Sequence, residues 1–388
     1  MTAPAPKGWC PSLFTPMQAA DGWLVRIKPP GATLRAETAR LLARAARNYG
    51  DRSVTLTLRG NLQLRGLSED AIGPVARMMV ESSLADPDPA IERRRAVIFP
   101  PLKGAHPLAV AIETALCRED LPHKFYVAVD ADPDLPLGDT WADITVICSD
   151  DACAIALAGT DKAARVGPEQ AVEAVRRLAR VFAESGTHRM RTLVATIGAG
   201  RIFTAAGLQT DAPAPIRAQR NPIGWLADVN AFGVGLPFGR LHAESLTALA
   251  AWAELHGDGT LRTTPWRALL LPGVADPEEI RAAAEKLGLI TDPGDRRRLI
   301  IACAGKPRCA AASVDVQADA MRLLDLPPVG LMHLSGCAKG CAHPGPTPIT
   351  LVGEEGRYSV VRNGSAATAP LARGLTLRQA IALLEHGA

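Results

Sequence analysis

The strongest constraint on the fold of this chain is a segment that occurs twice in it. The string Leu34-Arg-Ala-Glu37 returns as Leu241-His-Ala-Glu244, at a constant offset of 207 residues. Without any gap, the same offset aligns Thr57 with Thr264, Leu62 with Leu269, Leu64 with Leu271 and Gly66 with Gly273. These matches could arise by chance. If they mark a true repeat, both copies fold into the same structural unit.

Each copy has the pattern of a β-α-β unit. Apolar strands are expected from Trp23 to Lys28 and from Phe232 to Leu236, each followed by a turn that contains a glycine. Apolar residues at three- and four-residue intervals then predict helices from Ala36 to Asn48 and from Ala243 to His256. Such a unit is half of a ferredoxin-like fold and is too small to stand alone. We therefore expect two half-domains that pair about a pseudo-twofold axis into one domain.

A proline-rich, charged stretch follows each half-domain, at residues 86–95 and 291–298, and both stretches have the composition of linkers. A new apolar strand opens directly after each, at 96–99 and 299–302. The chain is therefore organised as A-B-A′-B′. The predicted boundaries are 1–85 for A, 86–215 for B, 216–290 for A′ and 291–388 for B′.

Segments B and B′ mix strands and helices. Strands are predicted at 124–129 and 143–147 and a long helix at 168–185 in B. In B′ we expect a helix at 316–324, a strand pair within 349–361 and a closing helix at 377–385. The predicted fold class is α+β, with two ferredoxin-like half-domains in one domain and two further α/β domains.

The composition excludes several classes of function. The 388 residues carry a formal net charge of only +3, which predicts neither nucleic-acid nor membrane binding. The first residues lack the apolar core of a secretory signal, and no stretch approaches the ~18 apolar residues of a membrane span. We expect a cytoplasmic protein, in which eight cysteines serve metal binding or packing rather than disulfides.

Four of the cysteines have the spacing of an iron–sulfur site. They are Cys303 and Cys309, with five residues between them, and Cys337 and Cys341, with three. Glycines and prolines among them predict loops that can wrap a [4Fe–4S] cluster. Structural zinc and simple packing are the alternatives, although zinc knuckles use two to four intervening residues. His333 and His343 lie beside the second pair. The other cysteines, Cys10, Cys117, Cys148 and Cys153, show no ligand spacing; Cys148 and Cys153 are expected to be small buried side chains, and Cys10 is expected to be either buried or reactive.

The cysteine spacing, the A-B-A′-B′ repeat and the strings at 57–63 and 121–125 together resemble the nitrite and sulfite reductase superfamily. The likeness covers nearly the whole chain. It implies a [4Fe–4S] cluster on Cys303, Cys309, Cys337 and Cys341, and by position Cys341 matches the ligand that bridges to a siroheme iron. It also implies a ring of basic side chains around a bound anion, matched here by Arg59, Arg95 and Lys124, whereas Tyr126 replaces the second lysine of that ring.

Within the superfamily, the strings at 8–17, 21–26, 264–266 and 333–344 resemble the precorrin-3B synthase family of aerobic cobalamin biosynthesis. That resemblance implies an oxygen-dependent monooxygenase, which hydroxylates precorrin-3A at C20 while a γ-lactone closes. It also implies a mononuclear non-haem iron, for which the sequence shows no 2-His-1-carboxylate spacing.

A substrate with eight carboxylates needs several cationic or hydrogen-bonding partners. Our candidates are Arg59, Gln63, Arg65, Arg95 and Lys124, of which Arg59, Arg95 and Lys124 are also the catalytic candidates. No G-x-G-x-x-G opens a helix after a strand, so electrons are expected from an external reductase or ferredoxin. Two alternatives stay open: a siroheme-dependent sulfite or nitrite reductase, and a non-catalytic electron carrier or tetrapyrrole-binding protein.

Overall fold

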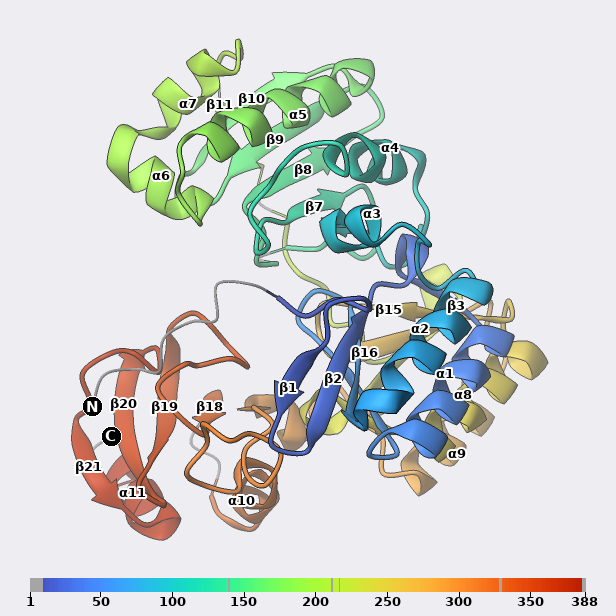
Figure 1. The fold of residues 1–388 in the computed structure, drawn as a ribbon, viewed down its shortest axis with the longest axis vertical. Helices are drawn as coiled ribbons and strands as arrows, with labels where there is room; N and C mark the ends of the chain where they lie inside the picture. Colours follow the sequence, from blue (N-terminus) through green and yellow to red (C-terminus); the bar gives the residue numbers. More distant parts are fainter. Residues whose placement is uncertain (1–9, 139, 211, 216, 328–329, 386–388) are drawn as a thin grey trace.

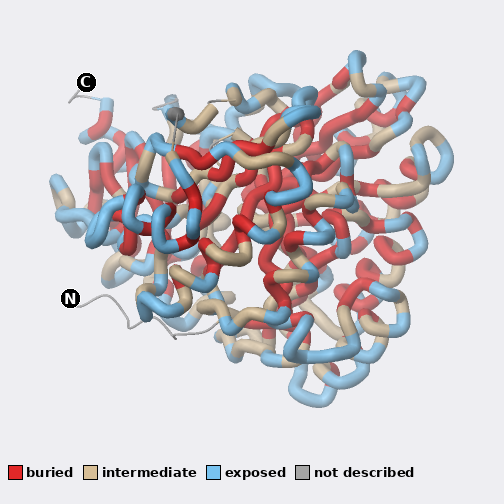
Figure 2. Tube along the Cα trace, turned by 90° about the horizontal axis from the view of Figure 1, so that it is seen from above, coloured by how far each residue is buried: buried red, intermediate tan, exposed pale blue. Residues whose placement is uncertain are grey.

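The computed structural model describes residues 10–138, 140–210, 212–215, 217–327 and 330–385. In Figure 1 the chain forms three lobes: B above, the two repeated units A and A′ at the lower right, and B′ at the lower left. Buried backbone runs through the interior of the lobes, and exposed backbone lies at their rims (Figure 2). Among the described residues, no helix combines the length and apolarity needed to cross a bilayer.

Segments A and A′ build one domain with two five-stranded sheets. The first sheet has the order β1 (Met17–Ala19), β2 (Gly22–Ile27), β5 (Leu62–Leu67), β4 (Ser53–Leu56) and β14 (Arg240–His242). The second has the order β12 (Gly224–Leu226), β13 (Ala231–Gly235), β16 (Ala268–Pro272), β15 (Thr260–Thr263) and β3 (Thr33–Arg35). The helices of this lobe are α1 (Ala36–Tyr49), α2 (Ile72–Glu81), α8 (Ala243–His256) and α9 (Pro277–Lys286).

The two units exchange an edge strand. β3 of A pairs with β15 of A′, and β14 of A′ pairs with β4 of A. The junctions match at the offset of 207 residues: the N–H of Ala36 donates to Gly259 O, and the N–H of Ala243 donates to Arg52 O. One hydrophobic core contains buried side chains of both units, including Leu42, Leu64, Leu249 and Leu271. Because each sheet is completed by the other unit, the repeat folds as a single domain.

Segment B forms the upper lobe around one mixed sheet. Its order is β11 (Ala212–Pro213), β10 (Lys162–Val166), β9 (Cys153–Leu157), β8 (Ile144–Cys148), β7 (Val127–Asp130) and β6 (Val97–Ile98). The helices are α3 (Pro89–Arg94), α4 (Pro107–Leu116), α5 (Pro168–Glu184), α6 (Met190–Ile197) and α7 (Ala199–Ala205). The prediction of a linker at 86–95 was wrong, because the Asp88 carboxylate caps α3 at its N-terminus and Pro89 occupies the first turn.

Segment B′ forms the lower left lobe. Its sheet has the order β17 (Ile300–Ala302), β18 (Met332–Ser335), β19 (Thr347–Glu354), β20 (Arg357–Gly364) and β21 (Ala372–Leu375). Two helices pack in this lobe, α10 (Val316–Arg322) and α11 (Leu377–Glu385). Short 3-10 turns complete the described elements: Pro30–Ala32, Glu69–Ala71, Ala227–Val229, Pro237–Gly239, Arg296–Leu299 and Leu323–Asp325.

A network of charges attaches B′ to the first half-domain. Arg65 pairs with Asp21 at 3.0 Å and donates to Arg308 O at 2.7 Å. Arg308 in turn pairs with Asp51. All four side chains are largely buried, so their attraction is screened less than that of a surface pair. Arg65 therefore connects the repeated domain to the loop that carries Cys309.

Candidate functional site

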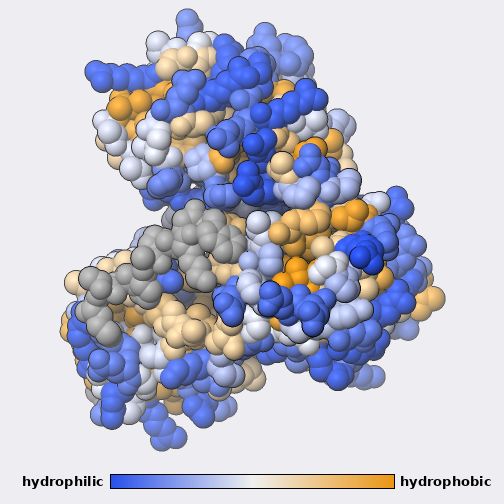
Figure 3. Space-filling model, in the orientation of Figure 1, coloured by the Kyte–Doolittle hydropathy of each residue, from blue (hydrophilic) through white to orange (hydrophobic). Residues whose placement is uncertain are grey.

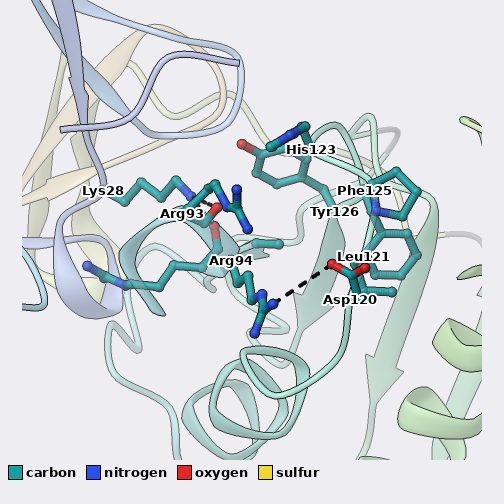
Figure 4. A pocket seen from close by; sticks show the side chains of 11 residues that line it. Lys28, Arg93, Arg94, Asp120, Leu121, His123, Phe125 and Tyr126 are labelled. Atoms are coloured by element: carbon teal, nitrogen blue, oxygen red, sulfur yellow. Dashed lines mark hydrogen bonds and ion pairs between the residues drawn. The ribbon is translucent and has the colours of Figure 1, made fainter. Parts of the chain in front are cut away.

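A pocket of about 160 Å³ lies where the first half-domain meets segment B. Figure 4 shows Lys28 reaching in from the end of β2, arginines from the end of α3, and the segment before β7 on the opposite side. We call it the cationic pocket, and its lining residues are Lys28, Arg93, Arg94, Arg95, Ala96, Asp120, Leu121, Pro122, His123, Phe125 and Tyr126. In Figure 3 the lower end of the upper lobe is hydrophilic on the face drawn. Three arginines and a lysine around one small space favour an anionic ligand.

Lys28 holds the end of α3 in place. Its Nζ donates to the carbonyls of Glu92 and Arg93 at 3.1 Å each and to that of Arg95 at 2.5 Å. An ammonium group at a helix C-terminus satisfies carbonyls that have no partner within the helix. Burial lowers the pKa of Lys28, against the opposing effect of Tyr126 and Glu92. Lys28 therefore fixes the position from which the three arginines extend.

Arg95 is buried and already has two carboxylate partners. Nη1 lies 3.0 Å from Glu92, and Nε lies 3.3 Å from Glu113. Burial acts to lower the pKa of Arg95, but the two carboxylates outweigh it and raise the pKa. The guanidinium is therefore charged but largely neutralised in this structure, and the uncompensated positive charge of the pocket comes from its neighbours.

Tyr126 is surrounded by the positively charged side chains of Lys28, Arg59 and Arg26. The Cζ atom of Arg59 lies 4.1 Å from the centroid of its ring, and Asn61 Nδ2 donates to its hydroxyl at 3.5 Å. Burial acts to raise the pKa of Tyr126, but Lys28, Arg59 and Arg26 together lower it. Phenolate is stabilised by nearby positive charge. The residue that departs from the superfamily's lysine is thus a buried phenol with enhanced acidity.

Arg59 lies in the turn after β4 and lines a second, smaller pocket of about 20 Å³. This space shares Lys28 and Arg95 with the cationic pocket. The structure therefore brings the sequence candidates Arg59 and Arg95 to one region, together with Lys28. Their roles in binding and catalysis remain predictions.

The other three candidates lie apart from these two pockets. Lys124 is half-buried and is not among the lining residues; its carbonyl accepts a hydrogen bond from Arg189 at 2.7 Å. Gln63 is half-buried on β5, opposite Arg26 of β2. Arg65 is held by Asp21 and Arg308, as described above. For these residues too, a role toward a ligand remains a prediction.

Sequence reasoning missed Lys28 and Arg26 and gave no role to His123. Lys28 and Arg26 lie on or next to a predicted strand, where a charged residue among apolar ones is a signal that could have identified them. The guanidinium of Arg26 is close enough to affect the pKa of Tyr126, and its Nε atom is buried with no hydrogen-bond partner among the described residues. Both residues belong to the candidate site only because the fold brings β2 against segment B.

The four cysteines of the expected cluster lie on two loops of B′ that face each other. The N–H of Gly336 donates to Cys303 Sγ at 3.2 Å, and that of Ser313 donates to Gly336 O at 3.0 Å. Burial raises the pKa of Cys303, and burial with the other three thiols raises that of Cys341 to about 11. The four sulfur atoms are therefore near enough to influence one another.

The residues around the cysteines suit a bulky inorganic ligand. A Cβ on Gly305 would lie 2.6 Å from the backbone N of Val316, and one on Gly336 would lie 2.6 Å from Ala312 Cβ, so both loops approach their neighbours too closely for a side chain. Backbone N–H donors to thiolate sulfur are typical second partners of such clusters. Among the described residues, no three His, Cys, Asp or Glu side chains are close enough to hold a single metal ion. A cubane separates its four thiolates by its own iron and sulfide atoms, so its ligands stand farther apart than those of one ion.

The histidines beside this site are different from each other. His343 Nδ1 lies 3.1 Å from Gly345 O. His333 is fully buried on β18, its ring 6.0 Å from that of His343, and both of its nitrogens lack partners among the described residues. Burial, followed by His343 and Arg267, lowers the pKa of His333 to about 4. His333 is therefore neutral at physiological pH.

The remaining cysteines lie elsewhere. Cys117 and Cys153 are buried, and burial raises the pKa of Cys117 to about 11. Cys148 is half-buried, and its sulfur lies 3.3 Å from that of Cys153 on the neighbouring strand. Cys10 is half-buried near the start of the described residues.

Comparison with known proteins agrees with the repeat. The family model of the nitrite/sulfite reductase ferredoxin-like half domain matches twice, at residues 16–82 and 227–288. The precorrin-3B synthase of Sinorhizobium sp. is 32% identical over 94% of this chain and 85% of that protein. The ferredoxin–nitrite reductase of Synechococcus elongatus is 25% identical over 86% of this chain and 77% of that protein. The NirA protein of Mycobacterium tuberculosis has the same fold, with a TM-score of 0.71, 20% identity and coverage of 92% of this chain and 78% of that one.

The double half-domain match confirms the predicted repeat and the α+β fold, and it places residues 16–82 and 227–288 in the ferredoxin-like half-domain family of the nitrite and sulfite reductase superfamily. Within that superfamily, the similarity to the Sinorhizobium enzyme over nearly the whole chain shows that this protein belongs to the precorrin-3B synthase family.

Proposed function

We propose that this protein is an oxygen-dependent monooxygenase that converts precorrin-3A to precorrin-3B, by hydroxylation at C20 and closure of a γ-lactone. One oxygen atom of O₂ enters the product and the other leaves as water, with two electrons and two protons from an external donor. The family membership supports the place of the reaction in cobalamin biosynthesis.

The observation that carries the proposal is the cationic pocket and its continuation toward Arg59. Precorrin-3A carries eight carboxylates, and the pocket joins Lys28 to three consecutive arginines. Arginine's planar fork binds carboxylates through two parallel hydrogen bonds. We infer that Arg93 and Arg94 bind peripheral carboxylates, while Arg59 and Arg95 orient the macrocycle from the adjoining space. Lys28 acts mainly by holding α3 in place, because its three donated bonds are already used.

Tyr126 fits a role in proton transfer. The macrocycle needs a proton donor or acceptor during hydroxylation and lactone closure, and a phenol with a lowered pKa gives up its proton more easily than an ordinary tyrosine. Its hydroxyl is held by Asn61 and its ring by Arg59, so its orientation is fixed before substrate binds. Both side chains can exchange a proton, but the superfamily's lysine carries a positive charge before it gives up its proton, whereas a phenol starts neutral.

For electron supply, we propose a [4Fe–4S] cluster on Cys303, Cys309, Cys337 and Cys341. Such a cluster, when bound, transfers single electrons from an external reductase or ferredoxin. The chain's own contribution is to direct the backbone N–H of Gly336 at the sulfur of Cys303 and to bring the four sulfur atoms together on two facing loops. The described residues offer no comparable set for a mononuclear non-haem iron, so no step is assigned to one.

The test is turnover. Anaerobically purified, reduced protein is incubated with precorrin-3A and then exposed to O₂, and the product mass is measured. We expect a product heavier by one oxygen atom, labelled when ¹⁸O₂ is supplied and absent without oxygen. Unchanged precorrin-3A in the presence of an intact cluster would contradict the proposal and favour a non-catalytic carrier.

A siroheme-dependent nitrite or sulfite reductase is the second candidate, because reductases of both kinds are among the relatives. It predicts a protein that contains extractable siroheme and reduces nitrite or sulfite with a ferredoxin-type donor. The loss of the second lysine to Tyr126 weakens this candidate, since clustered cations stabilise the charge that develops on the anion's oxygens. The absorption spectrum of the purified protein separates the two, because siroheme adds a strong Soret band to the broad iron–sulfur absorption.

A further inference from the structure

Arg267 has a backbone conformation that residues other than glycine rarely adopt. Its φ angle is +57°, in the left-handed region. The offset of 207 residues aligns it with Gly60, whose φ angle is +69°. Both lie in the same type of turn, in which a threonine hydroxyl accepts the N–H groups two and four residues later. Both halves thus need a left-handed residue here, and only the first half uses glycine.

The side chain of Arg267 reaches the loop that carries Cys341. Nη2 donates at 3.0 Å to the carbonyl of Ala342, the residue directly after Cys341. A Cβ on Gly239 would lie 3.0 Å from Cδ of Arg267, so the aliphatic stem passes tightly over that glycine. Strained residues persist where the surrounding structure determines their position and function uses it. Here the strained turn holds a guanidinium against the cysteine loops.

Among the described residues, Arg267 has no carboxylate partner in an ion pair. Burial lowers the pKa of Arg267 to about 10, and the neighbour that acts against this shift is the Cys303 thiolate. Arg267 is therefore charged at neutral pH. A guanidinium that is partly withdrawn from solvent is stabilised by an opposite charge nearby. A cluster held by four thiolates is an anion, and it gains one more negative charge when it accepts an electron.

We propose that Arg267 is the charge partner of the [4Fe–4S] cluster and raises its reduction potential by stabilising the added electron. This inference rests on the proposed function, because it needs the cluster on the four cysteines. Net charge around a cluster is one of the main determinants of its potential. His333 does not share this role, because it is neutral at physiological pH.

The reduction potential of the cluster-loaded full chain tests the proposal. We expect R267Q to disfavour reduction of the cluster at least about tenfold, a negative shift of 59 mV for one electron. R267K keeps the charge and stays near the wild-type potential. R262Q is the matched control: Arg262 lies in the same half-domain and pairs with Asp258, not with the cysteine loops, so its removal leaves the potential unchanged.

The strain gives a second measurement that needs no cluster. In protein stripped of iron, R267G melts at a higher temperature than R267A, because both lose the charge but only glycine accepts the left-handed turn. Equal melting temperatures would refute the strain argument. A loaded R267Q with the wild-type potential overturns the role of Arg267 while leaving the proposed function intact. A wild-type protein that binds neither iron nor sulfide overturns both.

Discussion

The turns after β4 and β15 have the same backbone but different chemistry. In the first, Arg59 and Gly60 follow the threonine, and Arg59 reaches Tyr126 beside the cationic pocket. In the second, Trp266 packs among apolar side chains, and Arg267 contacts the cysteine loop. The repeat thus preserved the hydrogen bonds that shape the turn, while the two residues inside each turn diverged. One half gathers cations around a pocket, and the other gathers four cysteines.

The largest effect is expected from removing a cysteine of the second half. C341S should lose most of the iron–sulfur absorption and lower turnover at least about 100-fold, since even partners outside the ligand set commonly cost 10- to 100-fold. Iron and sulfide content measure this directly. C148S is the control, because Cys148 lies in segment B and pairs with Cys153. Equal loss of iron and sulfide in C341S and C148S would contradict the prediction that the cluster depends on Cys341 and not on Cys148.

A smaller effect is expected from breaking the ion pair beneath the first half's pocket. R95A leaves Glu92, which is fully buried, without its cation, and should lower the free energy of unfolding by about 3–5 kcal/mol. Chemical denaturation measures the change. R94A is the neighbouring control, because Arg94 pairs with exposed Asp120 at 3.8 Å and should cost less than about 1 kcal/mol. Equal costs would show that Glu92 finds another partner.

Next in size is the loss of a ligand-facing cation. R59Q should reduce kcat/KM for precorrin-3A by about 10- to 100-fold, as expected for one charge-assisted hydrogen bond, and leave the cluster spectrum unchanged. R40Q removes the exposed pair of Arg40 with Glu254 and should leave kcat/KM as it is. If R59Q altered the cluster spectrum instead, the division of roles between the two turns would be wrong.

The smallest effect concerns the protonation of Tyr126. Its lowered pKa places its ionisation below that of an ordinary tyrosine, because Lys28, Arg59 and Arg26 overcome the opposing effect of burial. The folded state therefore releases this proton at a lower pH than the unfolded chain, and folding gains stability as the pH rises through that interval. Titration of phenolate absorbance should show an early component that disappears in Y126F. An unchanged early component in Y126F would assign it to another group.

The sequence predicted the repeat and five of the helices closely, and it gave no prediction for α2, α3, α4, α6, α7 and α9. The helix predicted from Ala243 to His256 has those bounds in the structure, and so does the closing helix at 377–385. The closing helix is marked by apolar residues on one face, whereas α8 is only weakly amphipathic and is marked by its alanines and leucines, which favour helix; both are local properties of the chain. The stretch at 86–95 was misassigned because its prolines and charges are equally compatible with a linker and with a short capped helix, and only the contact with Lys28 distinguishes them.

The sequence by itself therefore determined the features that local patterns and spacing encode. These are the offset of 207 residues, the α+β class and the four cysteines on glycine-containing loops. Tertiary structure alone decided that β3 and β14 exchange sheets, that Arg65 attaches B′ to the first half-domain, and that Lys28 and Arg267 lie beside the two sites. The physical reason is distance along the chain. These contacts join residues far apart in sequence, and they form only when packing brings the half-domains and the two B segments together.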